Sequence, residues 1–192
     1  MAEAKGNQAG PHEYPEWRRG HKSQGDHGLL KQQWEFFNSM APEAMYSGAF
    51  GAGKTRILCI TAANLAMPPQ ARVALVRKTL VSLRQTTLKT LLEPDGDLPP
   101  VLPDGAYDFR KVPGELEIRL KGGGVILPIG CDNHESIASL NVSDICIDEA
   151  TELDESEYNM LLGRARTVYA YQENYDNNRQ LGEMHVPKIR LA

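Results

Sequence analysis

The chain has no run of apolar residues approaching the ~20 that a membrane span needs, and no apolar core near its start that would direct secretion. Its cysteines, Cys59, Cys131 and Cys146, are odd in number and lack the C-x-x-C spacing of zinc or redox sites. The histidines match no metal-ligand spacing either. These absences argue against a disulfide scaffold and predict reduced, buried thiols in a cytoplasmic protein that does not contact a membrane.

Basic residues are not in excess, because 21 Lys and Arg stand against 25 Asp and Glu. A protein that binds DNA over its whole surface is usually basic, so the balance disfavours a simple nucleic-acid-binding module. It leaves room for a motor that grips DNA with one face. The length of 192 residues suits one domain, here residues 28–192, and the polar residues 1–27 are typical of a flexible N-terminal arm.

A glycine-rich segment matches G-x-x-x-x-G-K-[ST] at every fixed position, the Walker A pattern of phosphate-binding loops: Gly48, Ala49, Phe50, Gly51, Ala52, Gly53, Lys54 and Thr55. Glycines let the backbone wrap closely around an anion and point successive N–H groups at it. Lys54 would reach the terminal phosphates, and the Thr55 hydroxyl would bind Mg²⁺. A short apolar strand (44–46) before the loop and a helix (56–66) after it favour this motif over an ordinary turn.

The remaining pattern alternates strands with helices and predicts an α/β P-loop NTPase fold of the ASCE type, with a mostly parallel sheet and an inserted β-hairpin. Strands are expected at 72–76, 142–147 and 188–192, helices at 28–40, 80–92 and 155–166, and the hairpin strands at 115–120 and 125–129. Segments 95–105 and 169–183 are expected to be loops. The first helix is expected to pack with one face formed by Leu29, Leu30, Gln33, Trp34 and Phe37.

The second half of the candidate site is Asp148-Glu149, at the end of an apolar strand. ATP hydrolysis needs a carboxylate to secure Mg²⁺ and a group that orients the attacking water. Asp148 is the candidate for the metal, as in Walker B motifs, and Glu149 for the water. Two solvated acids capping a strand are the plain alternative, but the upstream loop favours the catalytic pair.

Three stretches in this order resemble the ATPase domain of the large terminase subunit of tailed bacteriophages, the ATPase that packages DNA into the prohead. They are residues 46–56 (YSGAFGAGKTR), residues 74–88, and residues 147–153 (IDEATEL) followed by Arg164-Ala165-Arg166. The resemblance covers residues 29–192 and implies ATP and Mg²⁺ as cofactors. It also implies double-stranded DNA, the portal protein and the small terminase subunit as partners, and a homo-oligomeric ring of about five subunits in the host cytoplasm.

Carried over by residue, the resemblance implies that Gln33 reads the adenine, with Gln32 as the neighbour that could be confused with it. Arg77 would sense or complete the site of a neighbouring subunit, and its alternative is a salt bridge at a strand end. With Lys54 and Glu149, Arg77 completes the predicted catalytic set.

Two departures from the family are visible. Phe50 stands where many large terminases carry a basic residue, so a catalytic arginine would come from Arg77, Arg164, Arg166 or another subunit. The chain also ends at the strand that precedes the coupling motif and nuclease domain of the family, so we expect a truncated ATPase domain without nuclease activity. A helicase-like ATPase, or a nucleotide-binding assembly module without turnover, are the alternative functions.

Overall fold

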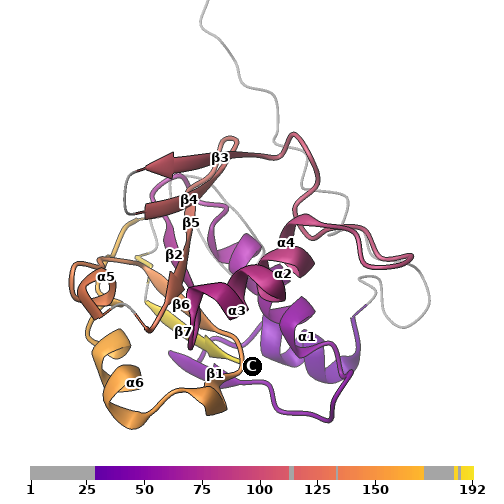
Figure 1. Cartoon of the computed structure of the whole chain (residues 1–192), viewed down its shortest axis with the longest axis horizontal. Helices are drawn as coiled ribbons and strands as arrows, with labels where there is room; N and C mark the ends of the chain where they lie inside the picture. The colour runs from indigo at the N-terminus through magenta and orange to yellow at the C-terminus, as the bar shows by residue number, and fades with distance from the viewer. Residues whose placement is uncertain (1–28, 113–114, 133, 171–183, 186) are drawn as a thin grey trace, which may run out of the picture.

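The computed structural model describes residues 29–112, 115–132, 134–170, 184–185 and 187–192. Its centre is a seven-stranded sheet with the strand order β1-β7-β6-β2-β5-β4-β3 (Figure 1). Strands β1, β7, β6, β2 and β5 are parallel to one another, and β4 and β3 add antiparallel to the β5 edge. The predicted α/β class with a mostly parallel sheet is therefore confirmed.

The strands are β1 (Glu43–Met45), β2 (Arg72–Arg77), β3 (Tyr107–Val112), β4 (Glu115–Leu120), β5 (Val125–Gly130), β6 (Asp144–Ile147) and β7 (Lys188–Leu191). The helices are α1 (Lys31–Phe37), α2 (Lys54–Leu65), α3 (Leu80–Gln85), α4 (Thr87–Leu92), α5 (His134–Ala138) and α6 (Glu155–Leu162), and η2 (Ala150–Glu152) is a 3₁₀ turn. The predicted arm, residues 1–27, and most of the predicted loop at 169–183 lie outside the described residues.

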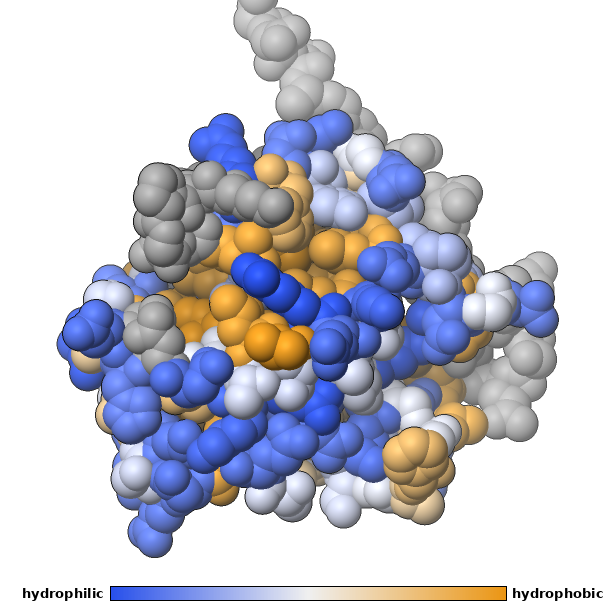
Figure 2. All heavy atoms as spheres, in the orientation of Figure 1, coloured by the Kyte–Doolittle hydropathy of each residue, from blue (hydrophilic) through white to orange (hydrophobic). Residues whose placement is uncertain are grey.

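Alternating residues of β2 divide the core into two layers, because successive side chains of a strand point to opposite faces of the sheet. Val73 and Leu75 pack in the cluster that contains residues of α2, α3 and α4. Ala74 and Val76 pack in the cluster that contains residues of α5 and α6. In the orientation of Figure 1, apolar residues gather near the centre of the visible face, and hydrophilic residues dominate below them (Figure 2).

All three cysteines are buried and free, which confirms the prediction from their spacing. Burial raises the pKa of the Cys131 thiol to about 12, and it also raises the pKa of Cys59 and Cys146. Among the described residues, no helix combines the length and apolar character needed to span a membrane.

The expected single helix over 80–92 is wrong, because the structure breaks it at Thr86 into α3 and α4. Thr86 has φ −126° and ψ −72°, outside the helical range. The Thr86 hydroxyl donates to the carbonyl oxygen of Ser82, four residues earlier, at 2.9 Å, a local bond that competes with helical geometry and bends helices.

The hairpin is confirmed, and its second strand, β5, pairs along its whole length with β2. Strand β3 was not expected from the sequence. The alternation of aromatic with charged residues over residues 107–110 (YDFR) is the signal that could have found it. The helix expected at 155–166 ends earlier, at Leu162, and helix α5 (His134–Ala138) lies in a segment for which the sequence indicated no element.

The face predicted for the first helix is only partly right. Phe36 is its buried residue, at 5% exposure, whereas Leu30 and Trp34 are 50% and 37% exposed. The helix begins at Lys31, so Leu30 precedes it, and the inward face is formed by Gln33, Phe36 and Phe37 at the i, i+3, i+4 spacing. The Phe36 ring lies 5.7 Å from the ring of Tyr46, which directly follows β1.

Phe36→Ala should lower the free energy of unfolding by about 3 kcal/mol, because it removes a buried ring between α1 and the end of β1. Leu30→Ala, at an exposed position beside the same helix, should change it by less than about 0.5 kcal/mol. Urea denaturation of both variants measures the difference. Equal losses would place the packing face of α1 at Leu30 and contradict the structure.

Candidate functional site

The carboxyl ends of the parallel strands lie side by side, and the segments with the candidate functional residues begin directly after them. The register pairs Met45 of β1 with Leu191 of β7, and Leu191 with Ile147 of β6. Ile147 in turn pairs with Val76 of β2. The glycine-rich loop (residues 48–55), Asp148 and Arg77 therefore meet at the carboxyl ends of the strands, where α/β proteins bind their ligands.

The glycine-rich loop leads directly into α2. Gly51 and Gly53 have φ of 78° and 71°, a left-handed conformation that other residues adopt only at a cost. Gly53 is the N-cap of α2, and Lys54 is its first residue. The Lys54 Nζ donates to the carbonyl oxygens of Gly48 at 3.1 Å and Ala49 at 3.4 Å. An ammonium group and a helix N-terminus thus converge on the loop, and together they favour an anion.

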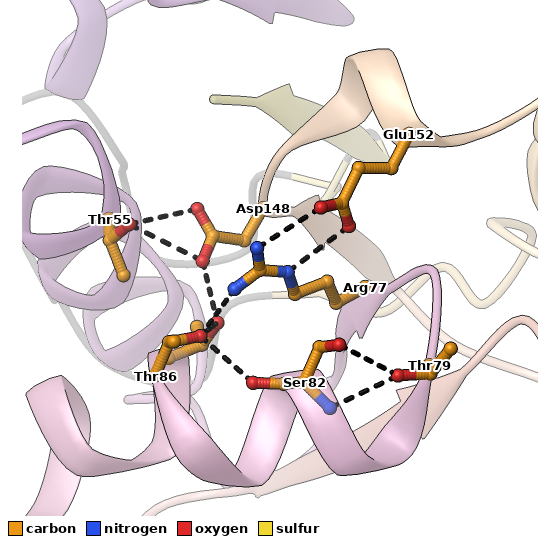
Figure 3. Close-up of polar contacts among 8 residues, drawn as sticks. Thr55, Arg77, Thr79, Ser82, Thr86, Asp148 and Glu152 are labelled. Carbon is orange, nitrogen blue, oxygen red and sulfur yellow. Dashed lines mark hydrogen bonds and ion pairs between the residues drawn. The ribbon is translucent and has the colours of Figure 1, made fainter. Parts of the chain in front are cut away.

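Asp148 is the centre of the polar contacts (Figure 3). The Thr55 hydroxyl donates to its Oδ1 at 3.0 Å and lies 3.3 Å from its Oδ2. The Thr87 hydroxyl donates to Oδ2 at 2.5 Å. Asp148 is 1% exposed, and a carboxylate so deeply buried needs such donors to offset its lost hydration.

Arg77 is engaged within this chain. Its Nε and Nη2 each donate to one carboxylate oxygen of Glu152 at 3.2 Å, and its Nη1 donates to the Thr86 hydroxyl. The hydrogen bond with Glu152 raises the pKa of Arg77, with Asp148 and Glu149 contributing smaller charge effects. The salt bridge at a strand end, the alternative considered for this residue, is therefore present.

Glu149 is the only residue other than glycine with a positive φ in the part of the chain that the structure describes. Its φ of 51° and ψ of 54° place it in the left-handed region, as the N-cap of η2. Such strain concentrates at functional sites. The neighbouring backbone holds it, because Ala150 N–H donates to Ala192 O and Glu152 N–H donates to Glu149 O, both at 2.9 Å.

Gln33 lies against the glycine-rich loop. Its Nε2 donates to Ala52 O at 3.3 Å, and its Oε1 accepts from the Leu30 N–H at 3.0 Å. A Cβ built on Gly53 would lie 2.9 Å from the Gln33 Nε2. The structure therefore brings Gln33 together with the loop, and its contact with adenine stays a prediction.

Arg164 and Arg166 lie elsewhere. The backbone of both residues bonds to Val142, before β6 begins, and Arg166 Nε donates to Asn141 Oδ1 at 3.4 Å. Asp148 follows the other end of that strand, at a separation of about 20 Å for an extended chain. Neither arginine can supply a charge to the site of its own chain in this arrangement.

The donor set around Asp148 fits Mg²⁺. A threonine hydroxyl and a carboxylate are the hard oxygen ligands that this ion takes in phosphate-binding sites, together with water and substrate phosphates. No cluster of three or more His, Cys, Asp or Glu side chains among the described residues could hold a metal ion.

Sequence reasoning missed two residues of this site, Thr87 and Glu152. Thr87 lay within a predicted helix that the structure breaks, and Glu152 lay three residues beyond Glu149. Both lie in stretches that carry the family resemblance, residues 74–88 and 147–153, but neither was given a role there. The unusual pair Thr86-Thr87, in a segment otherwise suited to a helix, was an available signal.

The fold is of the α/β class, with a mostly parallel sheet and a glycine-rich loop that leads into α2. No family model and no curated protein matches the sequence. Solved structures do match. In one crystal form, the large terminase from a thermophilic bacteriophage aligns with a TM-score of 0.57 and 17% identity over 84% of this chain and 38% of that one.

The same terminase in complex with ADP aligns with a TM-score of 0.57 and 18% identity, over 84% of this chain and 37% of that chain. Its complex with ATP-gamma-S gives 0.53 and 17%, with the same two shares. The chain thus spans less than two fifths of the length of these terminases. At this identity the likeness is one of fold: in structure the chain resembles a large terminase.

Gly51→Ala and Gly53→Ala should each cost about 1 kcal/mol of stability, because both place a side chain in the left-handed region. Only Gly53→Ala should also displace the Gln33 amide, since a Cβ at Gly51 meets nothing within 4 Å. The Gln33 side-chain resonance in a ¹H–¹⁵N spectrum, assigned with Gln33→Ala, should shift in the Gly53 variant alone. Equal shifts in both variants would refute the contact.

Proposed function

We propose that this chain is the ATP-binding and ATP-hydrolysing domain of a terminase motor that drives double-stranded DNA into a prohead. The observation that carries the proposal is the hydrogen bond between Thr55 on the glycine-rich loop and Asp148 after β6, which joins residues 93 positions apart. It brings a phosphate-binding loop and a metal-binding carboxylate to one point, as ATP hydrolysis requires. The likeness in fold to a large terminase supports the choice within this class.

In the proposed mechanism the glycine-rich loop and the N-terminus of α2 bind the phosphates. Lys54, now bonded to carbonyl oxygens of Gly48 and Ala49, exchanges them for phosphate oxygens. Thr55 and Asp148 would hold Mg²⁺, which would supply positive charge to neutralise the phosphates. Glu149 orients the attacking water and accepts its proton. Gln33, beside the loop, selects adenine.

Arg77 keeps its predicted role as a catalytic or sensing residue only if its contacts rearrange. Its guanidinium is bonded to Glu152 and Thr86, so reaching the γ-phosphate of its own or a neighbouring site would require breaking that ion pair. Phe50, at the corresponding part of the loop, is fully exposed and carries no charge. An arginine from another subunit of a ring would complete the site and couple hydrolysis to assembly.

The proposed partners follow from the proposed class. They are double-stranded DNA, further copies of the chain in a homo-oligomeric ring, a portal protein and a small terminase subunit, in the cytoplasm of an infected host. A second candidate is a nucleotide-binding assembly module without turnover of its own. The internal engagement of Arg77 favours this second candidate, because its guanidinium is then occupied by Glu152 rather than available to a phosphate.

Steady-state ATP hydrolysis by the purified chain tests the proposal, with Glu149→Gln as the key variant. Turnover should fall by roughly 10²–10⁴-fold, because the water loses its proton acceptor, while ATP affinity is retained. Glu155→Gln, an exposed glutamate at the start of α6, is the matched control and should hydrolyse ATP like the wild type. Double-stranded DNA should stimulate the wild type.

Other outcomes separate the candidates. ATP binding without turnover, both with and without double-stranded DNA, would favour the assembly module. Stimulation by single-stranded but not double-stranded DNA would favour a helicase-like ATPase. Absence of nucleotide binding in the wild type would refute the proposed function as a whole.

A further inference from the structure

A buried hydroxyl outside both the loop and the strand contacts the candidate metal ligand. The Thr87 Oγ1 lies 2.5 Å from Asp148 Oδ2, and Thr87 is completely buried. Thr55 bonds more closely to Oδ1. The two oxygens of Asp148 thus have different principal donors, Thr55 on α2 and Thr87 on α4.

The break between α3 and α4 delivers this hydroxyl. Thr87 is the first residue of α4, and Thr86 is the non-helical residue before it. Each side of the break is held: Thr86 Oγ1 donates to Ser82 O at 2.9 Å, and the Cys59 thiol of α2 donates to Thr87 O at 3.5 Å. One junction therefore presents Thr86 to Arg77 and Thr87 to Asp148.

The kind of donor matters for a carboxylate that must take up a cation. A lysine or arginine bonded to Asp148 would compete with the incoming Mg²⁺ for the same negative charge. The nearby Arg77 is instead turned to Glu152 and Thr86. A neutral hydroxyl can fix the rotamer of Asp148 and leave its full charge for the ion.

We propose that Thr87 is a positioning residue for Asp148: its hydroxyl holds Oδ2, so that Oδ1 stays beside Thr55 and faces the cation of a bound Mg–nucleotide. The inference rests on the proposed function. Partners that orient metal ligands in this way typically change metal affinity by about 10–100-fold when they are removed.

The test is the Mg²⁺ dependence of nucleotide binding, measured with a fluorescent ADP analogue. Thr87→Val removes the hydroxyl at nearly constant volume and should raise the Mg²⁺ concentration for half-maximal binding by roughly tenfold or more. Thr87→Ser, which keeps the hydroxyl, should restore it to near the wild-type value. Binding in EDTA should be the same for all variants.

The matched control is Thr61→Val, because Thr61 is also buried, but its hydroxyl bonds to the carbonyl of Ile57 in its own helix, at 2.8 Å. It should leave the Mg²⁺ dependence unchanged. A Thr87→Val protein with wild-type Mg²⁺ dependence would overturn the inference, as would an equal effect of Thr61→Val. Should Thr87→Val fail to fold, Thr87→Cys, a weaker donor, takes its place in the same titration.

A second measurement needs no nucleotide and separates this inference from the proposed function. Urea midpoints of Thr87→Val, Asp148→Asn and the double variant form a cycle. If Thr87 holds Asp148, the shift from Thr87→Val should be clearly smaller in the Asp148→Asn background. Additive shifts would overturn the positioning role, whereas failure of the wild type to bind nucleotide would refute only the proposed function.

Discussion

The structure of the site depends on hydrogen bonds to one buried carboxylate, that of Asp148. Asp148 leaves β6 at the edge of the sheet, almost without exposure to water, and an unpartnered charge there would be strongly destabilising. Thr55 and Thr87 satisfy it from two different helices. To meet this requirement, the loop after β1 must come back over the sheet, and the helix after β2 must break where it does.

A second set of contacts surrounds this centre and carries the positive charge. Arg77 extends from β2 and clamps Glu152 of η2 with two parallel hydrogen bonds. Because η2 begins directly after Glu149, this clamp and the backbone bonds to Ala192 and Glu152 together hold the left-handed conformation of Glu149. The two acids at the end of β6 therefore have different environments. Asp148 is buried and bonded to hydroxyl groups, whereas Glu149 is half-buried and its orientation is set by its backbone conformation.

These differences suit the separate roles we propose for the two acids. A metal ligand benefits from a fixed orientation in a dry setting, where its charge acts over a short distance with little screening. A residue that receives a proton from water must lie next to a solvent-accessible space. The arrangement of Lys54 over the loop carbonyls adds a cation that can turn to an incoming phosphate without leaving the site.

The sequence by itself determined the parts of this protein that are local or periodic. The spacing of Gly48, Gly53, Lys54 and Thr55 specified a glycine-rich loop before a helix, and the apolar strand ending at Asp148 specified its partner. What it left open depended on contacts between distant segments. Phe36 rather than Trp34 is buried because Tyr46 lies against it, and Arg77 is turned away from Asp148 because Glu152 is near. Thr87 became part of the site only because the fold placed its hydroxyl beside Asp148, a contact between residues 61 positions apart that no local pattern indicates.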